Sequence, residues 1–537
     1  MREFNVTGIC VPEMHYMVDI SEKIEQIFNL VEGKKYFTIN RGRQYGKTTT
    51  LGILEKRMQR EGYICASISF QYSDDKMFAD EEGFSQGLLE RIHRSLLIEH
   101  EEEAKLWIDE NITSFRKLDF FITERCKGKK IVLIIDESDE ASNNSIFVRF
   151  LKMLRDKFLF RNAGKDFTFH SVILAGVYDI RNLKQRMILA GNYTPSPGES
   201  SLNSPWNIAV DFKIDMSFSA KEIETMLVDY ENEHNTGMNI SEIAQEIRFY
   251  TSGYPYLVSR ICLMIENELD RNWTLEGIQA AIKLILRENS TLFDDLFKKI
   301  EENPGLNDLL FDLTIGKIKY EYNVDNQVIK LGIMFGFLAL ESENLQIHNK
   351  IFEIRITNYY ISNTMLNWRN NNIAQISVNE IVKNGVFDME LCLTKFKTHY
   401  AEIYTDKDLK FLERDGKLIF LTYLKPLLNN NGFYHFESQT RDYGKIDLVV
   451  DYYKQQFILE LKLWYGERKH NDAYEQLANY LKIKNITEGY LLTFDFRKKG
   501  KNSPPLDEEE GGVSESKWVE FEGKRIFDVV VRVGDEN

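Results

Sequence analysis

The feature that most constrains this fold is a loop containing Gly46-Lys47-Thr48, which joins an apolar run at residues 35–40 to an amphipathic run that ends near Arg60. This order predicts strand, loop and helix. Backbone N–H groups of such a loop and the N-terminus of the helix surround phosphate groups. The lysine then reaches the terminal phosphates, and the threonine hydroxyl is a ligand for Mg²⁺. The segment therefore predicts a nucleoside-triphosphate site.

A second run supplies the acids that such a site needs. Residues 131–135 are apolar and lead directly into Asp136 and Glu137. An uninterrupted apolar run is typical of a strand buried on both faces of a parallel sheet, and ligands bind at the C-terminal ends of such strands. There Asp136 would hold Mg²⁺ through water, and Glu137 would polarise the attacking water. Alone, the run is equally compatible with a core strand that has a polar end, but together with the loop it predicts ATP binding.

The loop departs from the usual phosphate-binding pattern at its start. The position of the opening glycine is Arg41, and Gly42 follows one residue late. Two further apolar runs, at 169–174 and 207–212, predict more strands of the same sheet. The residues of the loop that we expect to contact the nucleotide are Arg43, Gln44, Tyr45, Gly46, Lys47, Thr48 and Thr49.

These motifs resemble those of the bacterial AAA-ATPase-like family, which is related to the signal-transducing and archaeal-type ATPases. The resemblance rests on residues 4–8, 15–18, 36–37, 43–49, 136–137, 204–209 and 253–255. It implies that the segment around His15 and Tyr16 lies near the adenine, and that Asp179 or Arg181, after the fourth strand, senses the γ-phosphate. The alternatives are an ordinary surface histidine and a pair of solvated loop residues.

Helical sequence from residue 217 to about residue 302 predicts a lid. Ser219 and Glu222 have the spacing of a capping box at the start of its first helix. The turn Gly253-Tyr254-Pro255 looks like the glycine-x-proline turn by which such lids approach the base, so Pro255 is a candidate nucleotide contact. Arg260 either reaches the phosphates or is an exposed arginine after a helix-capping turn.

Residues 331–336 and 345–352 resemble the wing and the last helix of a winged-helix domain. Such a domain can bind DNA through a recognition helix, here around residues 325–330. That stretch is not rich in arginine, which favours a packing or interdomain role.

Two strand-like runs near the C-terminus bring acidic and basic residues together. A tight turn near Tyr453-Lys454 would place Asp447 opposite Glu460. Because side chains alternate with a period of two, Glu460, Lys462 and Asp447 then share one face of the sheet. These are the parts of a metal-dependent phosphodiesterase. Asp447 and Glu460 would bind Mg²⁺, with the Leu461 carbonyl as a further ligand, and Lys462 would orient the nucleophile or offset charge.

This spacing resembles the PD-(D/E)XK nuclease superfamily over residues 433–494, with Ile446-Asp447 and Glu460-Leu461-Lys462 as motif residues. By the resemblance, Gln476 matches a glutamine that faces the site from the following helix, and Glu437 is a candidate further acid. The alternative is a solvated strand face. The flanking residues are apolar, however, and charges in a core strand are costly unless paired or metal-bound.

Charge limits the contact with nucleic acid. The net charge of −15 argues against a protein that coats nucleic acid with its whole surface, so any contact is expected to be local. Basic residues at 468–470 and at 497–501 are candidates for this contact. The alternative is that they are solvated loop residues.

Composition also indicates the compartment. The five cysteines are scattered without a C-x-x-C pair, which indicates neither a disulfide framework nor a zinc site. No uncharged apolar run approaches the roughly 20 residues of a spanning helix, and the first residues lack the pattern of a signal peptide. We therefore expect a cytoplasmic protein with no membrane partner.

These expectations give an α/β chain of four parts. They are a P-loop ATPase core with a parallel sheet (1–215), a helical lid (216–305), a winged-helix-like segment (306–370), and a helical linker with an α/β PD-(D/E)XK nuclease-like domain and mixed sheet (371–537). The expected function is ATP binding and hydrolysis that regulates a Mg²⁺-dependent nuclease acting on nucleic acid, in a defence or mobile-element setting. The alternative is a non-cleaving switch or scaffold ATPase whose nuclease-like domain only binds nucleic acid or a partner. The sequence leaves the oligomeric state open, and also whether the nucleic acid is DNA or RNA.

Overall fold

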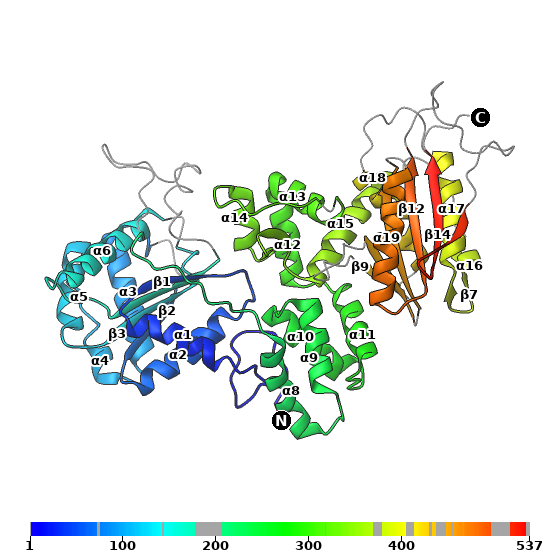
Figure 1. Ribbon diagram of the computed structural model, residues 1–537. Coiled ribbons are helices and arrows are strands. Elements are labelled where there is room, and N and C mark those ends of the chain that lie inside the picture. The colour runs from blue at the N-terminus through cyan, green and yellow to red at the C-terminus, as the bar shows by residue number, and fades with distance from the viewer. Residues whose placement is uncertain are drawn as a thin grey trace, which may run out of the picture. The chain divides into compact units, whose positions relative to one another are not determined.

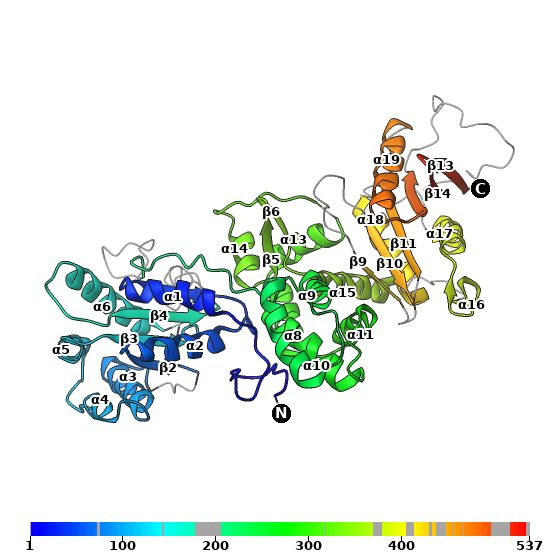
Figure 2. The same cartoon turned by 60° about the horizontal axis from the view of Figure 1, so that its bottom comes forward.

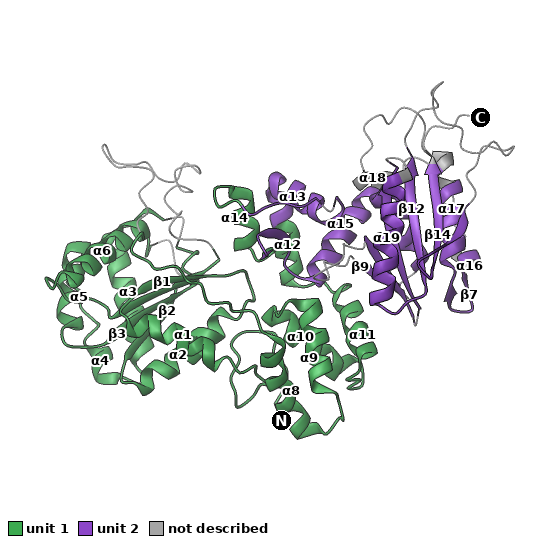
Figure 3. Ribbon diagram, in the orientation of Figure 1, with its two compact units in different colours: residues 1–298, 323–339 green, residues 299–322, 340–537 purple. Residues whose placement is uncertain are grey.

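Two compact units share the chain, residues 1–298 with 323–339 and residues 299–322 with 340–537 (Figure 3). The predicted division into four parts is finer than this and stays a prediction. The computed structural model describes residues 2–71, 76–141, 144–177, 206–316, 318–368, 378–403, 413–428, 432–435, 447–453, 455–464, 467–495 and 516–532. None of the described helices combines the length and hydropathy needed to span a bilayer.

The first unit is built on a parallel sheet (Figure 1). Its strands are β1 (Tyr36–Asn40), β2 (Ile64–Ser69), β3 (Ile131–Asp136) and β4 (Ser171–Gly176), in the order β1-β4-β3-β2. The first five residues of β3 and all of β4 are buried, as expected for strands covered on both faces. The run at 207–212, which we predicted as a strand, forms only one parallel bridge, between Val210 and Phe37. It lies beside β1, where the Val210 N–H donates to the Tyr36 carbonyl at 2.9 Å.

Helices cover this sheet because their apolar residues recur on one side. They are α1 (Ser21–Glu32), α2 (Lys47–Arg60), α3 (Glu81–Leu96), α4 (Glu101–Lys105), α5 (Phe115–Cys126) and α6 (Ser145–Asn162). One large cluster of buried side chains joins α3, α4, α5 and α6 to a face of the sheet, with Trp107, Phe84 and Phe150 among its fully buried aromatic residues.

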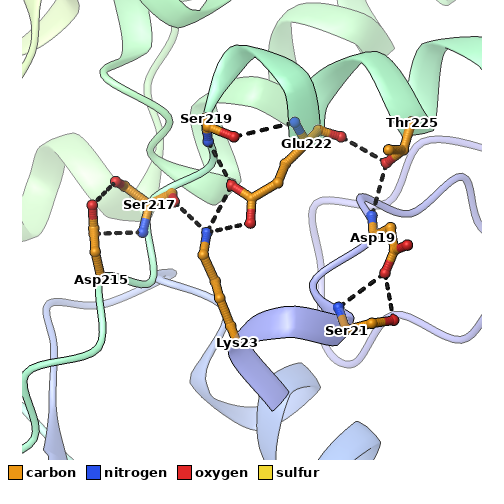
Figure 4. Close-up of polar contacts among 8 residues, drawn as sticks. All are labelled: Asp19, Ser21, Lys23, Asp215, Ser217, Ser219, Glu222 and Thr225. Carbon is orange, nitrogen blue, oxygen red and sulfur yellow. Dashed lines mark hydrogen bonds and ion pairs between the residues drawn. The ribbon is translucent and has the colours of Figure 1, made fainter. Parts of the chain in front are cut away.

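The predicted lid is helical, and its capping box is confirmed. The helices are α8 (Ala220–His234), α9 (Ile240–Thr251), α10 (Pro255–Glu268), α11 (Leu275–Ile285) and α12 (Thr291–Glu302). Ser219 and Glu222 exchange both hydrogen bonds of the box at the start of α8. Lys23 of α1 forms a 2.7 Å ion pair with Glu222 and donates to the Ser217 carbonyl at 2.6 Å, so the core is tied to the first turn of the lid (Figure 4).

The segment after the lid combines short helices with a hairpin. Its elements are α13 (Pro304–Thr314), α14 (Gln327–Met334), β5 (Leu338–Glu341), β6 (Asn344–Ile347) and α15 (Lys350–Trp368). Residues 331–336, which we assigned to the wing, instead form the end of α14 and the turn after it. This helix buries Ile329 and Gly332, and the hairpin of β5 and β6 follows it in the chain.

The second unit contains a mixed sheet of six strands, in the order β13-β14-β12-β11-β10-β9. These are β9 (Gly432–His435), β10 (Leu448–Tyr452), β11 (Gln455–Leu463), β12 (Glu488–Asp495), β13 (Lys517–Phe521) and β14 (Lys524–Arg532). The β11-β12 and β12-β14 pairs are parallel, and the others are antiparallel. The strand β13 pairs with β14 and forms one edge of the sheet.

Helices lie on both faces of this sheet (Figure 2). They are α16 (Val378–Ile381), α17 (Met389–Ile403), α18 (Glu413–Leu428) and α19 (Glu467–Ile483), with a short hairpin of β7 (Val382–Lys383) and β8 (Val386–Phe387). On α19, Leu477 packs in one cluster with Ile458 of β11 and Leu491 of β12. Phe494, on the opposite face of β12, contacts Phe396 of α17. The helical linker of the prediction thus forms the second cover of the sheet.

Candidate functional site

The glycine-containing loop has the backbone that a turn from strand into helix requires. Gly46, which precedes the first residue of α2, has φ +74°, a left-handed conformation that favours glycine. The Lys47 ammonium group curls back over the loop and donates to the carbonyls of Arg41 at 2.9 Å and Gly42 at 2.8 Å. Burial lowers the pKa of Lys47, and the nearby carboxylates of Asp139 and Asp136 oppose this effect.

The acids after β3 meet the start of α2. The Thr48 hydroxyl donates to Asp136 Oδ2 at 2.8 Å, and the Glu137 backbone N–H donates to Asp136 Oδ1 at 2.9 Å. Burial raises the pKa of Glu137, and the negative charges of Asp136 and Asp139 add to this. A hydroxyl and a carboxylate side by side are hard oxygen donors, and these residues therefore fit Mg²⁺.

The lid contacts the same loop. A β-carbon at Gly46 would lie 3.7 Å from Pro255, and the neighbouring Tyr254 hydroxyl donates to the Arg43 carbonyl. The Tyr254 ring stands edge-on to Tyr45, with ring centroids 4.7 Å apart. These contacts bring Pro255 to the loop, and its contact with the nucleotide stays a prediction.

The helix α12 touches the loop as well. The Gln44 amide donates to the Thr291 hydroxyl at 3.2 Å, and Arg43 lies 3.7 Å from Asp295. Arg260 is held elsewhere, since its guanidinium group forms a 2.6 Å ion pair with Glu288. The structure thus gives Arg260 a partner within the lid.

The N-terminal segment adjoins the start of α2. The Cys10 backbone N–H donates to the Thr49 hydroxyl at 3.1 Å. His15 is only 8% exposed and accepts a hydrogen bond from the Val11 N–H, so it is not a surface histidine. Asp179 and Arg181, the candidate γ-phosphate sensors, lie outside the described residues.

The C-terminal hairpin has the predicted register. Tyr452 pairs with Gln455 and Leu448 pairs with Leu459, which places Asp447 opposite Glu460. The turn passes through Tyr453, and Lys454 lies outside the described residues.

The three predicted charged residues converge at this hairpin. Glu460 Oε1 lies 2.5 Å from Lys462 Nζ, and Glu460 Oε2 accepts from the Asp447 backbone N–H at 3.3 Å. Asp447 Oδ2 accepts from the Leu461 N–H at 2.9 Å. Glu460 is fully buried and Asp447 is 7% exposed. Two carboxylates and an ammonium group therefore form one compact cluster.

Sequence reasoning missed a fourth member of this cluster. Lys417 of α18 is 2% exposed, and its Nζ lies 2.6 Å from Asp447 Oδ1. The available signal was a single lysine in the otherwise uncharged helical run 416–424. A lone buried charge of this kind needs a partner.

The lysines control the ionisation of the acids. Burial opposes the ionisation of Asp447, but Lys417 and Lys462 outweigh burial and hold the Asp447 pKa below its usual range. Burial raises the pKa of Glu460, and the charge of Asp447 adds to this. Burial also disfavours the charged form of Lys462, but Glu460 and Asp447 outweigh burial and raise the Lys462 pKa.

The oxygen atoms of Asp447 and Glu460 suit a divalent cation such as Mg²⁺. Within the described part of the chain, no three His, Cys, Asp or Glu side chains gather to hold a metal by themselves. The two carboxylates would therefore share the ion with backbone oxygen or water, and Glu437, the further candidate acid, lies outside the described residues.

The helix α19 lies over the face that carries Glu460. Gln476 is on this helix, one residue before Leu477, which packs with Ile458. In the basic stretch at 468–470, Arg468 and Lys469 are exposed. His470 is partly buried, and its Nε2 lies 3.0 Å from Asp528 Oδ2. His470 is therefore engaged inside the unit and not available to phosphate. Residues 497–501 lie outside the described residues.

Two family models match the chain, one over the glycine-containing loop and one over the C-terminal hairpin. The model of the AAA-like domain matches residues 22–353, and the model of the PD-(D/E)XK nuclease superfamily matches residues 433–503. No curated protein sequence matches the chain.

Solved structures are also similar to the chain. The Walker-type ATPase paby2304 of Pyrococcus abyssi covers 66% of this chain and 99% of its own, at 12% identity and a TM-score of 0.44. The Aeropyrum pernix ORC2 protein, in its ADPNP-ADP complexes, covers 68% of this chain and 98% of its own, at 13% identity and a TM-score of 0.35.

Proposed function

The chain belongs to the AAA-like domain family and also carries a PD-(D/E)XK nuclease-superfamily domain, and from this premise we propose that it hydrolyses ATP and uses the nucleotide to regulate a Mg²⁺-dependent nuclease. The observation that carries the proposal is the convergence of Asp447, Glu460 and Lys462 on one buried point of the second unit. The substrate class is nucleic acid, and the setting is defence or mobile-element biology.

In the first unit, Lys47 would release the loop carbonyls and donate to the terminal phosphates, and the loop N–H groups would bind the remaining phosphate oxygens. Thr48 and Asp136 would hold Mg²⁺, which neutralises phosphate charge when bound. Glu137 would accept a proton from the attacking water, a role that its raised pKa assists.

In the second unit, Asp447 and Glu460 would hold Mg²⁺ beside the scissile phosphodiester. Lys462 Nζ, held by Glu460 and still 32% exposed in its side chain, would orient the attacking water or offset charge on the phosphate. Exposed Arg468 and Lys469 at the start of α19 would bind the backbone of the nucleic acid.

The path of the chain supports regulation of the second unit by the first. Residues 323–339 belong to the first unit, and the chain leaves and re-enters the second unit on either side of them. Phe335, within this segment, lies against Gly42 of the loop. If a bound nucleotide moves the loop, it would also displace residues 323–339, which continue directly into the second unit.

The test is digestion of DNA and of RNA with Mg²⁺, with and without ATP. Asp447→Asn and Lys462→Met should abolish cleavage. The control is Asp451→Asn, which lies on β10 of the same hairpin and should cleave like wild type. Lys47→Ala should remove the effect of ATP. If wild type, Asp447→Asn and Lys462→Met all leave the nucleic acid intact, the chain is not a nuclease.

The second candidate is a switch ATPase whose nuclease-like domain binds nucleic acid or a partner without cleaving. The observation that favours it is the pairing of Lys417 with Asp447, because two lysines then balance two carboxylates without a metal ion. This candidate predicts nucleic-acid or partner binding that survives both Asp447→Asn and removal of Mg²⁺.

A further inference from the structure

The carboxylate oxygens of the C-terminal cluster are all engaged by groups of the chain itself. Asp447 Oδ1 is bound by Lys417 and Asp447 Oδ2 by the Leu461 N–H. Glu460 Oε1 forms an ion pair with Lys462 but accepts no hydrogen bond from the described residues, and Glu460 Oε2 accepts from the Asp447 N–H. A divalent cation bound to Asp447 Oδ1 would stand beside the Lys417 ammonium group, and the two positive charges would repel each other.

Of these partners, Lys417 is the one that a metal ion would most readily displace. The Leu461 N–H belongs to β11, the Asp447 N–H lies directly before β10, and Lys462 is on the same strand as Glu460 and is partly exposed. Lys417 instead approaches from α18 and is 2% exposed. Its ammonium group stands 2.6 Å from Asp447 Oδ1, where a cation bound to that oxygen would also stand.

The position of Lys417 on the sheet is fixed by packing. A β-carbon at the preceding residue, Gly416, would lie 2.9 Å from the Phe494 ring, so the first half of α18 sits directly on β12. The lysine therefore cannot leave the cluster by a shift of the helix. A change of the Lys417 side-chain rotamer would release Asp447.

From these contacts we propose that Lys417 is a built-in counter-ion of Asp447 that competes with the divalent cation for that carboxylate and thereby sets the metal affinity of the site. The inference rests on the proposed nuclease function. With Lys417 and Lys462 in place, a divalent ion gives the cluster excess positive charge. An anionic phosphodiester offsets that charge, so metal and nucleic acid bind more tightly together than apart.

Calorimetric titration of the full chain with Mn²⁺ tests the competition. Lys417→Gln, which keeps a hydrogen-bond donor, and Lys417→Met should bind Mn²⁺ about tenfold or more tightly than wild type, because a like charge beside the ion is removed. The matched control is Lys425→Met, on the same helix but bonded to the Asn358 carbonyl, and it should bind like wild type. Equal or weaker binding in a folded Lys417 variant would overturn the proposal.

Amine labelling of wild type with mass spectrometry gives a measurement that does not depend on a variant. Lys417 should resist the reagent without metal and become labelled when Mn²⁺ displaces it from Asp447, while Lys425 labelling stays constant. Labelling of Lys417 that does not change at saturating Mn²⁺ would contradict displacement.

If wild type neither binds Mn²⁺ nor cleaves while Lys417→Gln gains Mn²⁺ binding, the competition stands and the proposed nuclease activity fails. If wild type cleaves and Lys417→Gln binds no more tightly, the nuclease stands and the competition fails.

Discussion

The carbonyl oxygen of Phe335 lies 2.5 Å from the point where a β-carbon on Gly42 would stand. Position 42 must therefore be glycine for the phosphate-binding loop to pack against the end of α14. This contact accounts for the glycine that comes one residue late in the loop pattern.

Gly42→Ala should therefore disturb both the packing and the nucleotide site. Overpacking of this kind destabilises by about 1–3 kcal/mol, and displacement of the loop should weaken ATP binding. Chemical denaturation and titration with a fluorescent ATP analogue would measure the two effects. The control is Gly33→Ala, at the end of α1 with φ −71°, which should leave ATP affinity unchanged. Wild-type affinity in Gly42→Ala would show that the contact with Phe335 does not shape the loop.

Glu137→Gln should separate ATP binding from ATP hydrolysis. The amide keeps the shape of the side chain but cannot accept a proton from water, and loss of a general base lowers turnover by roughly 10²–10⁴-fold. ATP affinity should stay near that of wild type, because Lys47 and Thr48 are unchanged. Steady-state phosphate release and nucleotide titration would measure both quantities. The exposed Glu140→Gln should hydrolyse ATP normally, and unchanged turnover in Glu137→Gln would assign the base elsewhere.

The strands that carry both sites could be predicted because their signal is local. The run 131–135 is apolar without interruption, which fits a strand buried on both faces. In the hairpin, the alternation of side chains fixed the register once the turn was placed, and so Asp447 was correctly set opposite Glu460.

The partners that complete these sites could not be predicted because they come from distant segments. Lys417 lies 30 residues before Asp447 on a different element, and Asp528 lies 58 residues after His470. The sequence shows that a buried lysine needs an acid, but not which acid. For the same reason the sequence did not show that His470 pairs with Asp528, because the packing of α19 on β14 brings these two side chains together.

Lys157→Met should destabilise the first unit. The Lys157 ammonium group is buried and donates to Asp119 at 2.7 Å, to Asp166 at 2.8 Å and to the Thr123 hydroxyl at 2.8 Å. Removing one partner of a buried ion pair costs about 3–5 kcal/mol. We expect a value near the lower limit, because the Asp119 side chain is 39% exposed. Urea denaturation would measure the loss. Lys105→Met, at an exposed pair on α4, is the control and should unfold like wild type, and an equal midpoint for Lys157→Met would contradict the role of this network.

Glu55→Gln should change how stability depends on pH. Burial, with the charge of Glu99, raises the pKa of Glu55 from 4.5 to about 7. Between these values the folded chain binds more protons than the unfolded chain, so this carboxyl makes stability fall as pH rises from 4.5 to 7. Above pH 7, where Glu55 is ionised in both the folded and the unfolded chain, the loss of stability reaches its full value. Glutamine carries no charge, and Glu55→Gln should therefore be more stable than wild type at pH 8 and differ less at pH 5. Thermal unfolding across this range would show it, with the exposed Glu90→Gln as control. A stability difference that stays constant with pH would mean that Glu55 ionises in the folded chain as easily as in the unfolded one.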